Sequence, residues 1–413
     1  MSRALLIRFS GRDAPGLTAA LSAALAAHGA TILDVGQAVV HESLALGFLV
    51  EAENAAALEA ALASQTARLG LHVSFAFVGA AEMQAGLHGR LHNSLLVTLL
   101  GPTITATHLA RVTGILAHHG LNVDRIERLS AQLAPVDGPG NACLELAVSG
   151  NEVDEHGLHA EFLAAAQELT IDIAFQRESI FRRNRRLFAF DMDSTLIQGE
   201  VIDELAKLAG VGEQVAKITE AAMRGELNFD ESFTRRVALL KGLPAEQALA
   251  LRERIPLSLG AERLIRTLKL LGYRTAILSG GFTFFAQSLQ GRLGIDEFHA
   301  NELEIVDGKV TGRVIPPIVN GARKAALLAR IAEREGIALE QVVAVGDGAN
   351  DLPMMELAGM GIAYRAKPVV RAKADHAISA LGLDGLLYLI GVRDSDLIRH
   401  EAQAAPGSHS KDA

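Results

Sequence analysis

The chain has 413 residues, of which 49% are hydrophobic and 21% charged, so its composition is that of a folded globular protein and not of a disordered one. The formal net charge of −9 gives no overall basic character for binding nucleic acid. No apolar run approaches the roughly 18 residues of a membrane span, and the apolar stretch after Met1 is too short for a signal peptide. The single cysteine, Cys143, excludes an intramolecular disulfide framework and a cysteine-based zinc site. We expect a soluble, cytoplasmic protein of about two to four domains.

The first half of the chain contains two similar units, since residues 25–32 resemble residues 116–123, which lie 91 positions later. In each unit a strand-like run is followed by a glycine, an amphipathic helix, two strand-like runs, a second helix and a last strand. The expected ranges are 4–9, 14–27, 32–40, 44–51, 55–68 and 71–78, then 94–100, 106–118, 123–130, 143–148, 161–169 and 171–175. This order predicts two ferredoxin-like βαββαβ domains, at residues 1–85 and 93–178.

The pattern changes over residues 185–395. Three short apolar runs, at 187–190, 275–278 and 342–345, alternate with helical sequence, which predicts an α/β domain with a doubly wound parallel sheet. The helical sequence between the first two runs is too long for one crossover helix, so we expect an inserted helical cap at about 200–265. Residues 396–413, small and polar toward the end, are expected to form a disordered tail.

Asp191 and Asp193 directly follow the first of these runs, in the sequence Asp-Met-Asp-Ser-Thr. Two carboxylates so close together repel each other unless a cation or a shared proton is present. With a divalent cation bound to their oxygens, one carboxylate can act as nucleophile and the other as general acid and base. A surface turn or a helix N-cap would also explain the pair, and the pair alone leaves both interpretations open.

Three further polar clusters follow along the chain. Ser279 and Gly280 come after the second apolar run, where a hydroxyl and backbone amides can bind an anion. Lys324 lies near the start of a predicted helix, and the sequence Gly-Asp-Gly-Ala-Asn-Asp at residues 346–351 follows the third run. Each cluster taken alone is also ordinary turn or surface chemistry.

Together, in this order and after predicted strands, the four clusters resemble the four motifs of the haloacid dehalogenase superfamily. The resemblance covers residue 187 to about residue 380. It implies that Asp191 is a nucleophile that becomes an aspartyl phosphate and that Asp193 is the general acid and base. It implies that Ser279 and Lys324 hold the phosphoryl oxygens. It also implies a Mg²⁺ ion bound by the carboxylates of Asp191 and Asp347 and by the main-chain carbonyl of Asp193.

Two charged residues of the predicted cap bear on the substrate. Glu200 follows the first motif, and Arg236 flanks an apolar helical stripe. An opposed carboxylate and guanidinium near a phosphate site would suit a zwitterionic amino-acid phosphate. The pattern alone favours the plainer interpretation, in which Glu200 is a first-turn helix acid and Arg236 a surface charge.

The sequence around these residues also resembles the phosphoserine phosphatases, which catalyse the last step of serine biosynthesis. The resemblance implies hydrolysis of O-phospho-L-serine, with Glu200 and Arg236 holding its amino and carboxyl groups. Arg235 competes with Arg236 for the second role. Further substrate contacts implied by the resemblance are those of Met223, Phe229 and Asn350.

Two other functions stay open at this point. A phosphotransferase would use the same aspartyl phosphate and pass the phosphoryl group to homoserine or another alcohol. A non-catalytic amino-acid sensor on a degenerate phosphatase scaffold would not need the complete set of Asp191, Asp193, Lys324 and Asp347.

The two βαββαβ units resemble ACT domains, which bind amino acids and regulate metabolic enzymes. In the first unit, Gly11 and Asp13 lie in a sequence close to the effector loop of that family. The second unit keeps Gly101 but lacks the aspartate and the Pro-Gly pair, so a plain strand-to-helix turn explains it as well. The resemblance implies an amino-acid effector, serine or glycine, and a homodimer.

A basic cluster at residues 182–186 lies between the two halves of the chain. It is a candidate phosphate or nucleic-acid patch. Short charge runs are more often solvated, so we expect an exposed linker.

Overall fold

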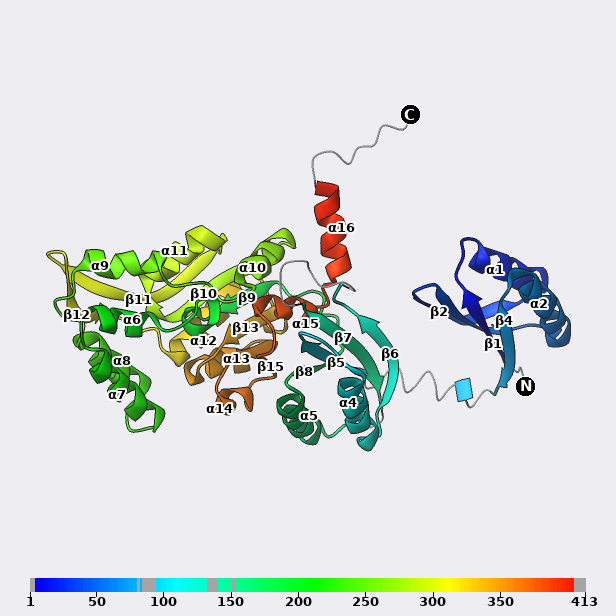
Figure 1. The fold of residues 1–413 in the computed structure, drawn as a ribbon, viewed down its shortest axis with the longest axis horizontal. Helices are drawn as coiled ribbons and strands as arrows, with labels where there is room; N and C mark the ends of the chain where they lie inside the picture. Colours follow the sequence, from blue (N-terminus) through cyan, green and yellow to red (C-terminus); the bar gives the residue numbers. More distant parts are fainter. Residues whose placement is uncertain (1–3, 80–81, 84–93, 132–139, 151–152, 405–413) are drawn as a thin grey trace, which may run out of the picture. The chain divides into compact units, whose positions relative to one another are not determined.

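The computed structural model describes residues 4–79, 82–83, 94–131, 140–150 and 153–404 (Figure 1). These residues form two compact units, residues 1–93 and residues 94–413, which are described separately. Among the described residues no helix is both long and apolar enough to cross a membrane.

The first unit is a βαββαβ domain with an antiparallel sheet in the order β2-β3-β1-β4. Its elements are β1 (Ala4–Arg12), α1 (Leu17–Ala27), β2 (Thr31–Val40), β3 (Ser43–Glu51), α2 (Ala55–Leu69) and β4 (His72–Val78). Alternate residues of β1, such as Ile7 and Phe9, are buried against the helices, as half-buried strands require. Helix α1 begins later than expected because Gly16, at φ 90°, directly precedes it.

A second βαββαβ domain begins the other unit, with the sheet order β6-β7-β5-β8. Its elements are β5 (Ser94–Gly101), α4 (Ala106–His118), β6 (Asn122–Arg128), β7 (Ala142–Ser149), α5 (Glu155–Leu169) and β8 (Asp172–Arg177). Helix α5 begins before the expected residue 161. Its start is set by Asp154, whose carboxylate accepts the Gly157 N–H at 3.1 Å.

The third domain is built on a seven-stranded sheet in the order β12-β11-β10-β9-β13-β14-β15. The strands are β9 (Leu187–Phe190), β10 (Arg274–Phe282), β11 (Glu297–Val306), β12 (Lys309–Ile315), β13 (Val342–Gly346), β14 (Met360–Tyr364) and β15 (His376–Ile378). Strands β9, β10, β13, β14 and β15 are parallel, as is the β10–β11 pair, and β12 alone runs antiparallel to its neighbour β11. The chain order reverses about β9, and at such a point ligands bind beyond the carboxyl ends of the strands.

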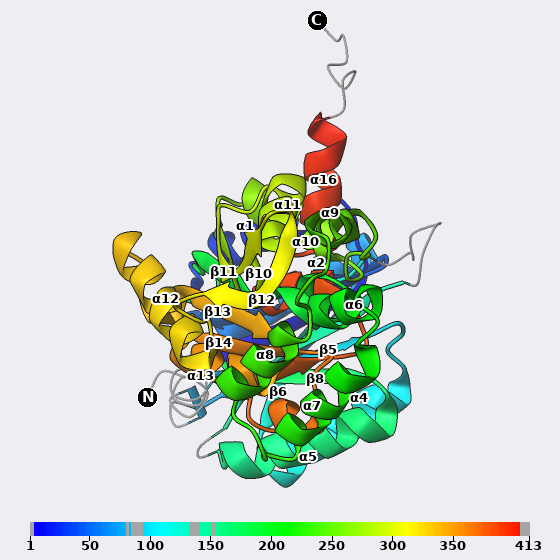
Figure 2. The ribbon, with the colours of Figure 1, turned by 90° about the vertical axis from the view of Figure 1, so that its left-hand side faces the viewer.

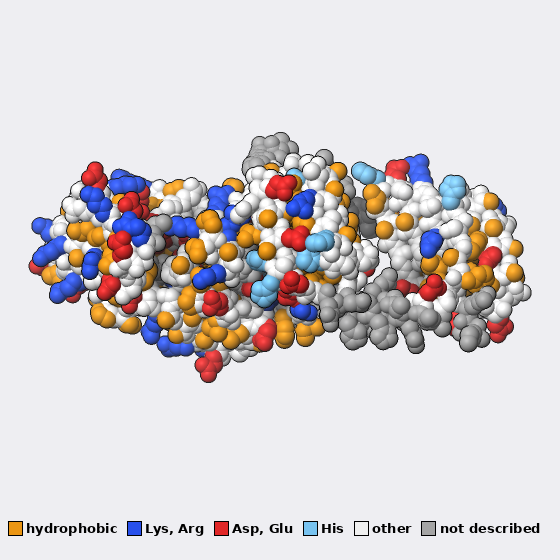
Figure 3. Space-filling model, turned by 90° about the horizontal axis from the view of Figure 1, so that it is seen from below, with side chains coloured by type: hydrophobic (Ala, Val, Ile, Leu, Met, Phe, Trp, Pro, Cys, Tyr) orange, Lys and Arg blue, Asp and Glu red, His pale blue; other side chains and the backbone are white. Residues whose placement is uncertain are grey.

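Helices and short turns surround this sheet (Figure 2). They are α10 (Ala261–Leu270), α11 (Thr283–Leu293), α12 (Gly321–Arg334), η3 (Leu339–Gln341), η4 (Ala349–Asp351), α13 (Leu352–Leu357), α14 (Pro368–Arg371), η5 (Leu383–Gly385) and α15 (Leu386–Leu389). The predicted α/β class, with two ferredoxin-like domains before a doubly wound sheet and a helical insertion, is confirmed. On the face seen in Figure 3, positive and negative side chains are interspersed over the sheet domain and its helical insertion.

The helical cap is inserted after β9 and the wide turn η1 (Met192–Leu196). It comprises α6 (Val201–Leu208), α7 (Gly212–Met223), α8 (Phe229–Ala238), α9 (Ala245–Ala250) and η2 (Leu251–Glu253). A bridge between Ile197 and Leu257 closes its neck, so the insertion ends before the expected residue 265. Helix α10 belongs to the sheet layers instead, because Leu264 and Leu268 are buried in the same core as Phe188.

The segment expected to be a disordered tail begins with a helix. Residues 394–404 form helix α16 (Asp394–Ala404), and residues 405–413 lie outside the described part of the chain. Two contacts tie the start of the helix to the core: the Asp394 N–H donates to the Leu129 carbonyl oxygen, and the Tyr388 hydroxyl donates to the Asp394 carboxylate. The expectation of disorder from residue 396 was therefore wrong as far as Ala404.

The basic cluster between the domains was also expected to be solvated, and for two of its arginines this is wrong. Arg182 is 2% exposed and pairs with Glu145 of β7, itself 3% exposed. Arg185 is buried and donates to the Glu340 carbonyl oxygen, whereas Arg183 is exposed. The linker is thus part of the packed interface between the second βαββαβ domain and the sheet domain.

We expect Arg182→Ala to destabilise this unit strongly, because it would leave the Glu145 carboxylate buried without its partner. Breaking a buried pair in this way costs about 3–5 kcal/mol. Arg183→Ala is the matched control, and an exposed site of this kind should change stability by less than about 0.5 kcal/mol. Urea unfolding of the full chain measures both variants. Equal stabilities would contradict the structural role of the pair.

Candidate active site

Polar side chains converge where three parallel strands end. Asp191 directly follows β9, Ser279 lies in the last part of β10, and Asp347 directly follows β13. Because β10 and β13 pair in parallel with β9 on its two sides, their carboxyl ends lie at one edge of the sheet.

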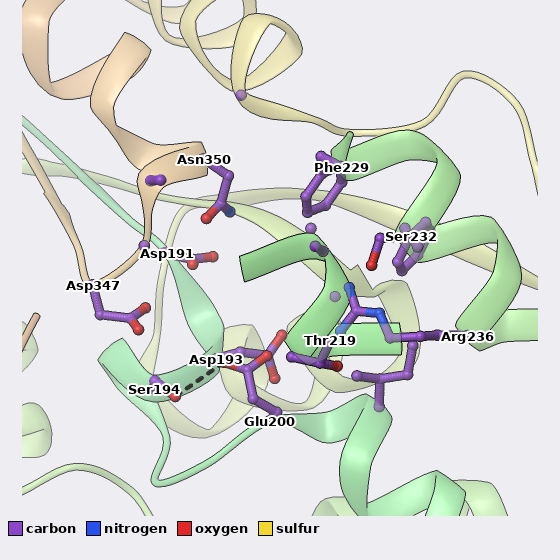
Figure 4. Close-up of a pocket in the computed structure, with 18 of the residues that line it drawn as sticks. Asp191, Asp193, Ser194, Glu200, Thr219, Phe229, Ser232, Arg236, Asp347 and Asn350 are labelled. Atoms are coloured by element: carbon purple, nitrogen blue, oxygen red, sulfur yellow. Dashed lines mark hydrogen bonds between the residues drawn. The ribbon is translucent and has the colours of Figure 1, made fainter. Parts of the chain in front are cut away.

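A pocket of about 880 Å³ opens at this edge, between the sheet and the cap (Figure 4). Nine of the residues that border it matter for the argument: Asp191, Asp193, Glu200, Phe229, Ser232, Arg236, Gly280, Asp347 and Asn350. The fold therefore brings predicted site residues such as Asp191 and Asp347, which are more than 100 positions apart in the sequence, to one cavity. Ser279 and Lys324 are fully buried beside it.

The turn η1 holds the two aspartates of the first motif in different positions. Ser194 adopts a positive φ of 55°, and the chain bends so that both carboxylates border the pocket. The Asp191 carboxylate accepts the Met192 N–H at 2.7 Å. The Asp193 carboxylate accepts the Val201 N–H at 2.9 Å, at the start of α6. Each oxygen pair is fixed before any ligand binds.

The surroundings of Asp193 favour the protonated form of its carboxyl group. Burial raises the pKa of its carboxyl well above the ordinary value, and the neighbouring charges of Glu200 and Asp191 raise it further. A protonated carboxyl group beside a second, hydrogen-bonded carboxylate is the arrangement that general acid catalysis needs.

Three carboxylates, those of Asp191, Asp347 and Asp351, have oxygen atoms that lie within 4.8 Å of one another. Burial and the Asp191 charge raise the pKa of Asp347 to about 8 and that of Asp351 to about 7. Lys324 partly compensates, since its Nζ lies 2.8 Å from Asp191 Oδ1 and 2.6 Å from Asp351 Oδ1. The remaining excess of negative charge and the all-oxygen donors fit a hard divalent cation.

Sequence reasoning missed Asp351 as a member of this cluster. It is fully buried, and its carboxylate accepts the Gly348 N–H at 3.0 Å. The sequence does contain a hint of this role, because Asp351 ends the fourth motif, four residues after Asp347. The carboxylate of Asp193, by contrast, is not part of the cluster.

The Ser-Gly-Gly segment at the end of β10 lies against both the sheet and the cap. The Ser279 hydroxyl accepts the Gly281 N–H at 2.9 Å. A Cβ at Gly281 would collide with the Asp193 carboxylate, and one at Gly280 would lie 3.0 Å from the ring of Phe229. Glycine is therefore required at both positions for the approach of Asp193 and of the cap.

The cap contributes opposite charges to the pocket: Arg236 lies on the side away from Asp347, and Glu200 lies beside Asp193 and Ser194 (Figure 4). Arg236 borders the pocket, whereas the side chain of Arg235 is exposed. The described residues provide no hydrogen bond or ion pair for Arg236, and burial lowers the pKa of its guanidinium. Glu200 accepts a hydrogen bond from the Ser194 hydroxyl at 3.1 Å, and burial and the Asp191 charge raise its pKa.

Of the three other predicted substrate contacts, two border the pocket, and the side chain of the third is not described. Phe229 borders the pocket and stacks on Phe233 with ring centroids 5.7 Å apart. Asn350 points into the pocket across from Phe229 in Figure 4. Met223 is the last residue of α7, but its side chain lies outside the described part of the structure.

The predicted effector residues lie outside this pocket. Gly11 and Asp13 belong to the first unit and Gly101 to the second βαββαβ domain. A Cβ at Gly11 would lie 2.6 Å from Leu71, and one at Gly101 would lie 3.0 Å from Ile171. Both glycines therefore have a packing reason that is independent of any effector.

Comparison with known families matches three parts of the chain. Residues 188–356 match the haloacid dehalogenase-like hydrolase family, and residues 3–76 and 93–176 each match an ACT domain family. The first match contains the four motifs, and the other two coincide with the two βαββαβ domains.

The chain is 42% identical to a phosphoserine phosphatase of Streptomyces coelicolor, covering 97% of this chain and 94% of the relative. It is also 42% identical to phosphoserine phosphatase SerB2 of Mycobacterium tuberculosis, covering 95% and 94%. Among solved structures, a probable phosphoserine phosphatase of Vibrio cholerae is 35% identical with a TM-score of 0.57, covering 76% of this chain and 90% of that one.

A haloacid dehalogenase family hydrolase of Salmonella enterica is 34% identical with a TM-score of 0.61, covering 72% of this chain and 99% of that one. The similarity to the two curated relatives extends over both ACT domains and the hydrolase domain. The chain therefore belongs to the ACT-domain-containing phosphoserine phosphatases of the haloacid dehalogenase superfamily.

Proposed function

We propose that the protein hydrolyses O-phospho-L-serine to L-serine and phosphate through a phosphorylated Asp191, as the last step of serine biosynthesis. The observation that carries the proposal is the pocket itself. One end gathers Asp191 and Asp193, with Lys324 buried behind them, and the other presents the Arg236 guanidinium, which has no partner among the described residues. The Glu200 carboxylate borders the pocket beside Asp193. A phosphorylated zwitterion has matching groups at both ends.

In the first step the Asp191 carboxylate attacks phosphorus, and the bond from phosphorus to the serine oxygen breaks. Asp193, whose surroundings favour its protonated form, donates its proton to the departing oxygen. The ammonium of Lys324 and the hydroxyl of Ser279 bind the phosphoryl oxygens and offset their charge.

In the second step water attacks the phosphorus of the aspartyl phosphate, the bond from phosphorus to the Asp191 oxygen breaks, and phosphate is released. Asp193, now ionised, accepts a proton from that water, which restores both carboxyl groups. The Val201 N–H fixes Asp193 in both steps, so one side chain can serve as acid and then as base from the same position.

The cluster of Asp191, Asp347 and Asp351 supports a Mg²⁺ site, with Asp191 and Asp347 as carboxylate ligands and the Asp193 carbonyl as a further ligand. Asp351, paired with Lys324, holds that lysine in place. A bound Mg²⁺ would supply neutralisation of charge on the transferring phosphoryl group.

We expect Mg²⁺ affinity to rise with pH between about 6 and 9. Because the metal-free pKa of Asp347 is raised to about 8, Mg²⁺ must displace a proton below that pH, and its affinity should fall up to about tenfold per pH unit. The metal-free protein should lose stability as pH rises from about 4 to about 8, because the Asp347 carboxyl is ionised in the unfolded chain over that range while the buried one keeps its proton. Mg²⁺ should therefore raise Tm more at high pH.

Thermal unfolding of the full chain at several pH values, with and without Mg²⁺, measures this dependence. Asp347→Asn should remove it, and Asp307→Asn, at the exposed hairpin turn, should retain it. A Mg²⁺ effect independent of pH would contradict the proposed ligand set.

Asp193→Asn should slow turnover of phosphoserine on the order of 10²–10⁴-fold, because an amide can neither donate nor accept the proton. With p-nitrophenyl phosphate, whose leaving group needs no acid, the variant should still release a burst of one nitrophenol per active site before slow turnover. Stopped-flow absorbance measures the burst. A variant with no burst but normal folding would contradict the division of roles between Asp191 and Asp193.

Specificity for phosphoserine should depend on Arg236. Loss of a charged hydrogen-bonding partner for the carboxylate should lower kcat/KM for phosphoserine on the order of 10²-fold in Arg236→Ala. Phosphoethanolamine, which has no carboxylate, should be affected little. Arg235→Ala, one residue away and exposed, is the control. Equal losses for both substrates would refute carboxylate recognition by Arg236.

The ACT domains support regulation by an amino acid, and we propose serine or glycine, with Gly11 and Asp13 at the effector loop of the first domain. A homodimer stays a prediction. It is supported by strand β2 at the edge of the first sheet, where Ile32, Val35 and Val40 are 47%, 53% and 70% exposed.

A further inference from the structure

Ser232 is a buried residue of the cap that sequence reasoning did not single out. It lies on α8, borders the pocket and is 2% exposed. Its hydroxyl oxygen has no hydrogen-bond partner among the described residues. Buried polar groups in folded proteins are nearly always hydrogen-bonded, so an unpartnered hydroxyl at a pocket needs an explanation.

Hydroxyl groups in helices commonly donate to the carbonyl oxygen four residues earlier, which would be the ordinary explanation. Thr66, Thr113 and Thr219 of this chain all do so. At Ser232 only the backbone N–H bonds to the Asn228 carbonyl oxygen, at 3.0 Å, and the hydroxyl does not. The Ser232 hydroxyl therefore remains available to a ligand in the pocket.

The neighbour of Ser232 across one helical turn is Arg236. Residues four apart lie on the same face of a helix, and both residues border the pocket. Figure 4 shows the Ser232 hydroxyl directed toward the Arg236 guanidinium. The guanidinium also lacks a described partner. One face of α8 thus presents two adjacent groups, the Ser232 hydroxyl and the Arg236 Nε–H, that can donate hydrogen bonds and have no acceptor in the described part of the chain.

We propose that the Ser232 hydroxyl donates a hydrogen bond to the substrate carboxylate that Arg236 binds, which makes Ser232 a specificity-determining residue. A carboxylate has two oxygens and about four acceptor positions, so it can accept from a guanidinium and a hydroxyl together. This inference rests on the proposed function, in which the substrate is phosphoserine.

The test compares kcat/KM for three phosphate esters by phosphate release from the full chain. O-phosphoserine has both charged groups, O-phosphoethanolamine lacks the carboxylate, and 3-phosphooxypropanoate lacks the ammonium. Ser232→Ala should lower the ratio of phosphoserine to phosphoethanolamine by about 10-fold or more, since hydrogen bonds to charged groups are strong. Its loss with 3-phosphooxypropanoate should match its loss with phosphoserine.

The ratio within one preparation is independent of the fraction of folded enzyme, so a destabilised variant still gives an answer. Thr234→Ala removes a hydroxyl from the exposed face of the same helix and should leave the ratio unchanged. An unchanged ratio in Ser232→Ala would overturn the inference. So would a loss confined to the two substrates with an ammonium group, which would place the hydroxyl at the substrate amine.

Failure of the proposed function gives a different result. In that case the wild-type enzyme would not prefer phosphoserine to phosphoethanolamine, and Arg236→Ala would not change the ratio. If the wild type shows the preference and Arg236→Ala removes it while Ser232→Ala keeps it, only the assignment of Ser232 fails.

Discussion

The active site depends on the crowding of carboxylates around one buried ammonium group. Asp191, Asp347 and Asp351 lie together at the ends of β9 and β13, and Lys324 forms ion pairs with two of them. One lysine cannot neutralise this group, and burial together with the charge of Asp191 raises the pKa values of Asp347 and Asp351. A site with this excess of carboxylates favours a divalent cation, which would in turn favour an anionic phosphoryl group.

In the proposed function, the cap gives this phosphoryl site its selectivity. Two contacts join the cap to the sheet domain: Phe229 lies against the backbone of Gly280, and the Asn320 amide donates to the Asp230 carboxylate at 3.1 Å. Through such contacts α8 lies over the carboxyl ends of the strands, and Arg236 borders the same cavity as Asp191. We therefore propose that the sheet domain provides the catalytic groups and that the inserted cap recognises the substrate.

Local pattern was enough to predict much of this arrangement. Short apolar runs followed by polar clusters placed Asp191, Ser279 and Asp347 at one edge of a parallel sheet, because the direction of parallel strands leaves few alternatives. The choice between Arg235 and Arg236 could not be made from sequence, since both lie in the last turn of α8. Only the packing of that helix determines that the side chain of Arg236 borders the pocket.

The wrong predictions concern residues whose environment is made by distant parts of the chain. The residues around Arg182 in the sequence are typical of a solvated linker. Its ion pair with Glu145, 37 positions earlier, instead buries it between the second βαββαβ domain and the sheet domain. Likewise, Asp394 anchors α16 through the Leu129 carbonyl oxygen, a contact between segments far apart in sequence. Asp351 was missed because Asp347 alone satisfied the motif, and the ion pair to Lys324 appears only in three dimensions.

The most direct test of the central claim is to find the phosphoryl group on the enzyme during turnover. Wild-type protein with Mg²⁺ is mixed with phosphoserine labelled in its phosphoryl group, quenched with acid within one turnover, and digested for mass spectrometry. We expect the label on the peptide that contains Asp191, in a linkage that hydroxylamine cleaves. Release of phosphate with no labelled enzyme, or with label on another residue, would contradict the account.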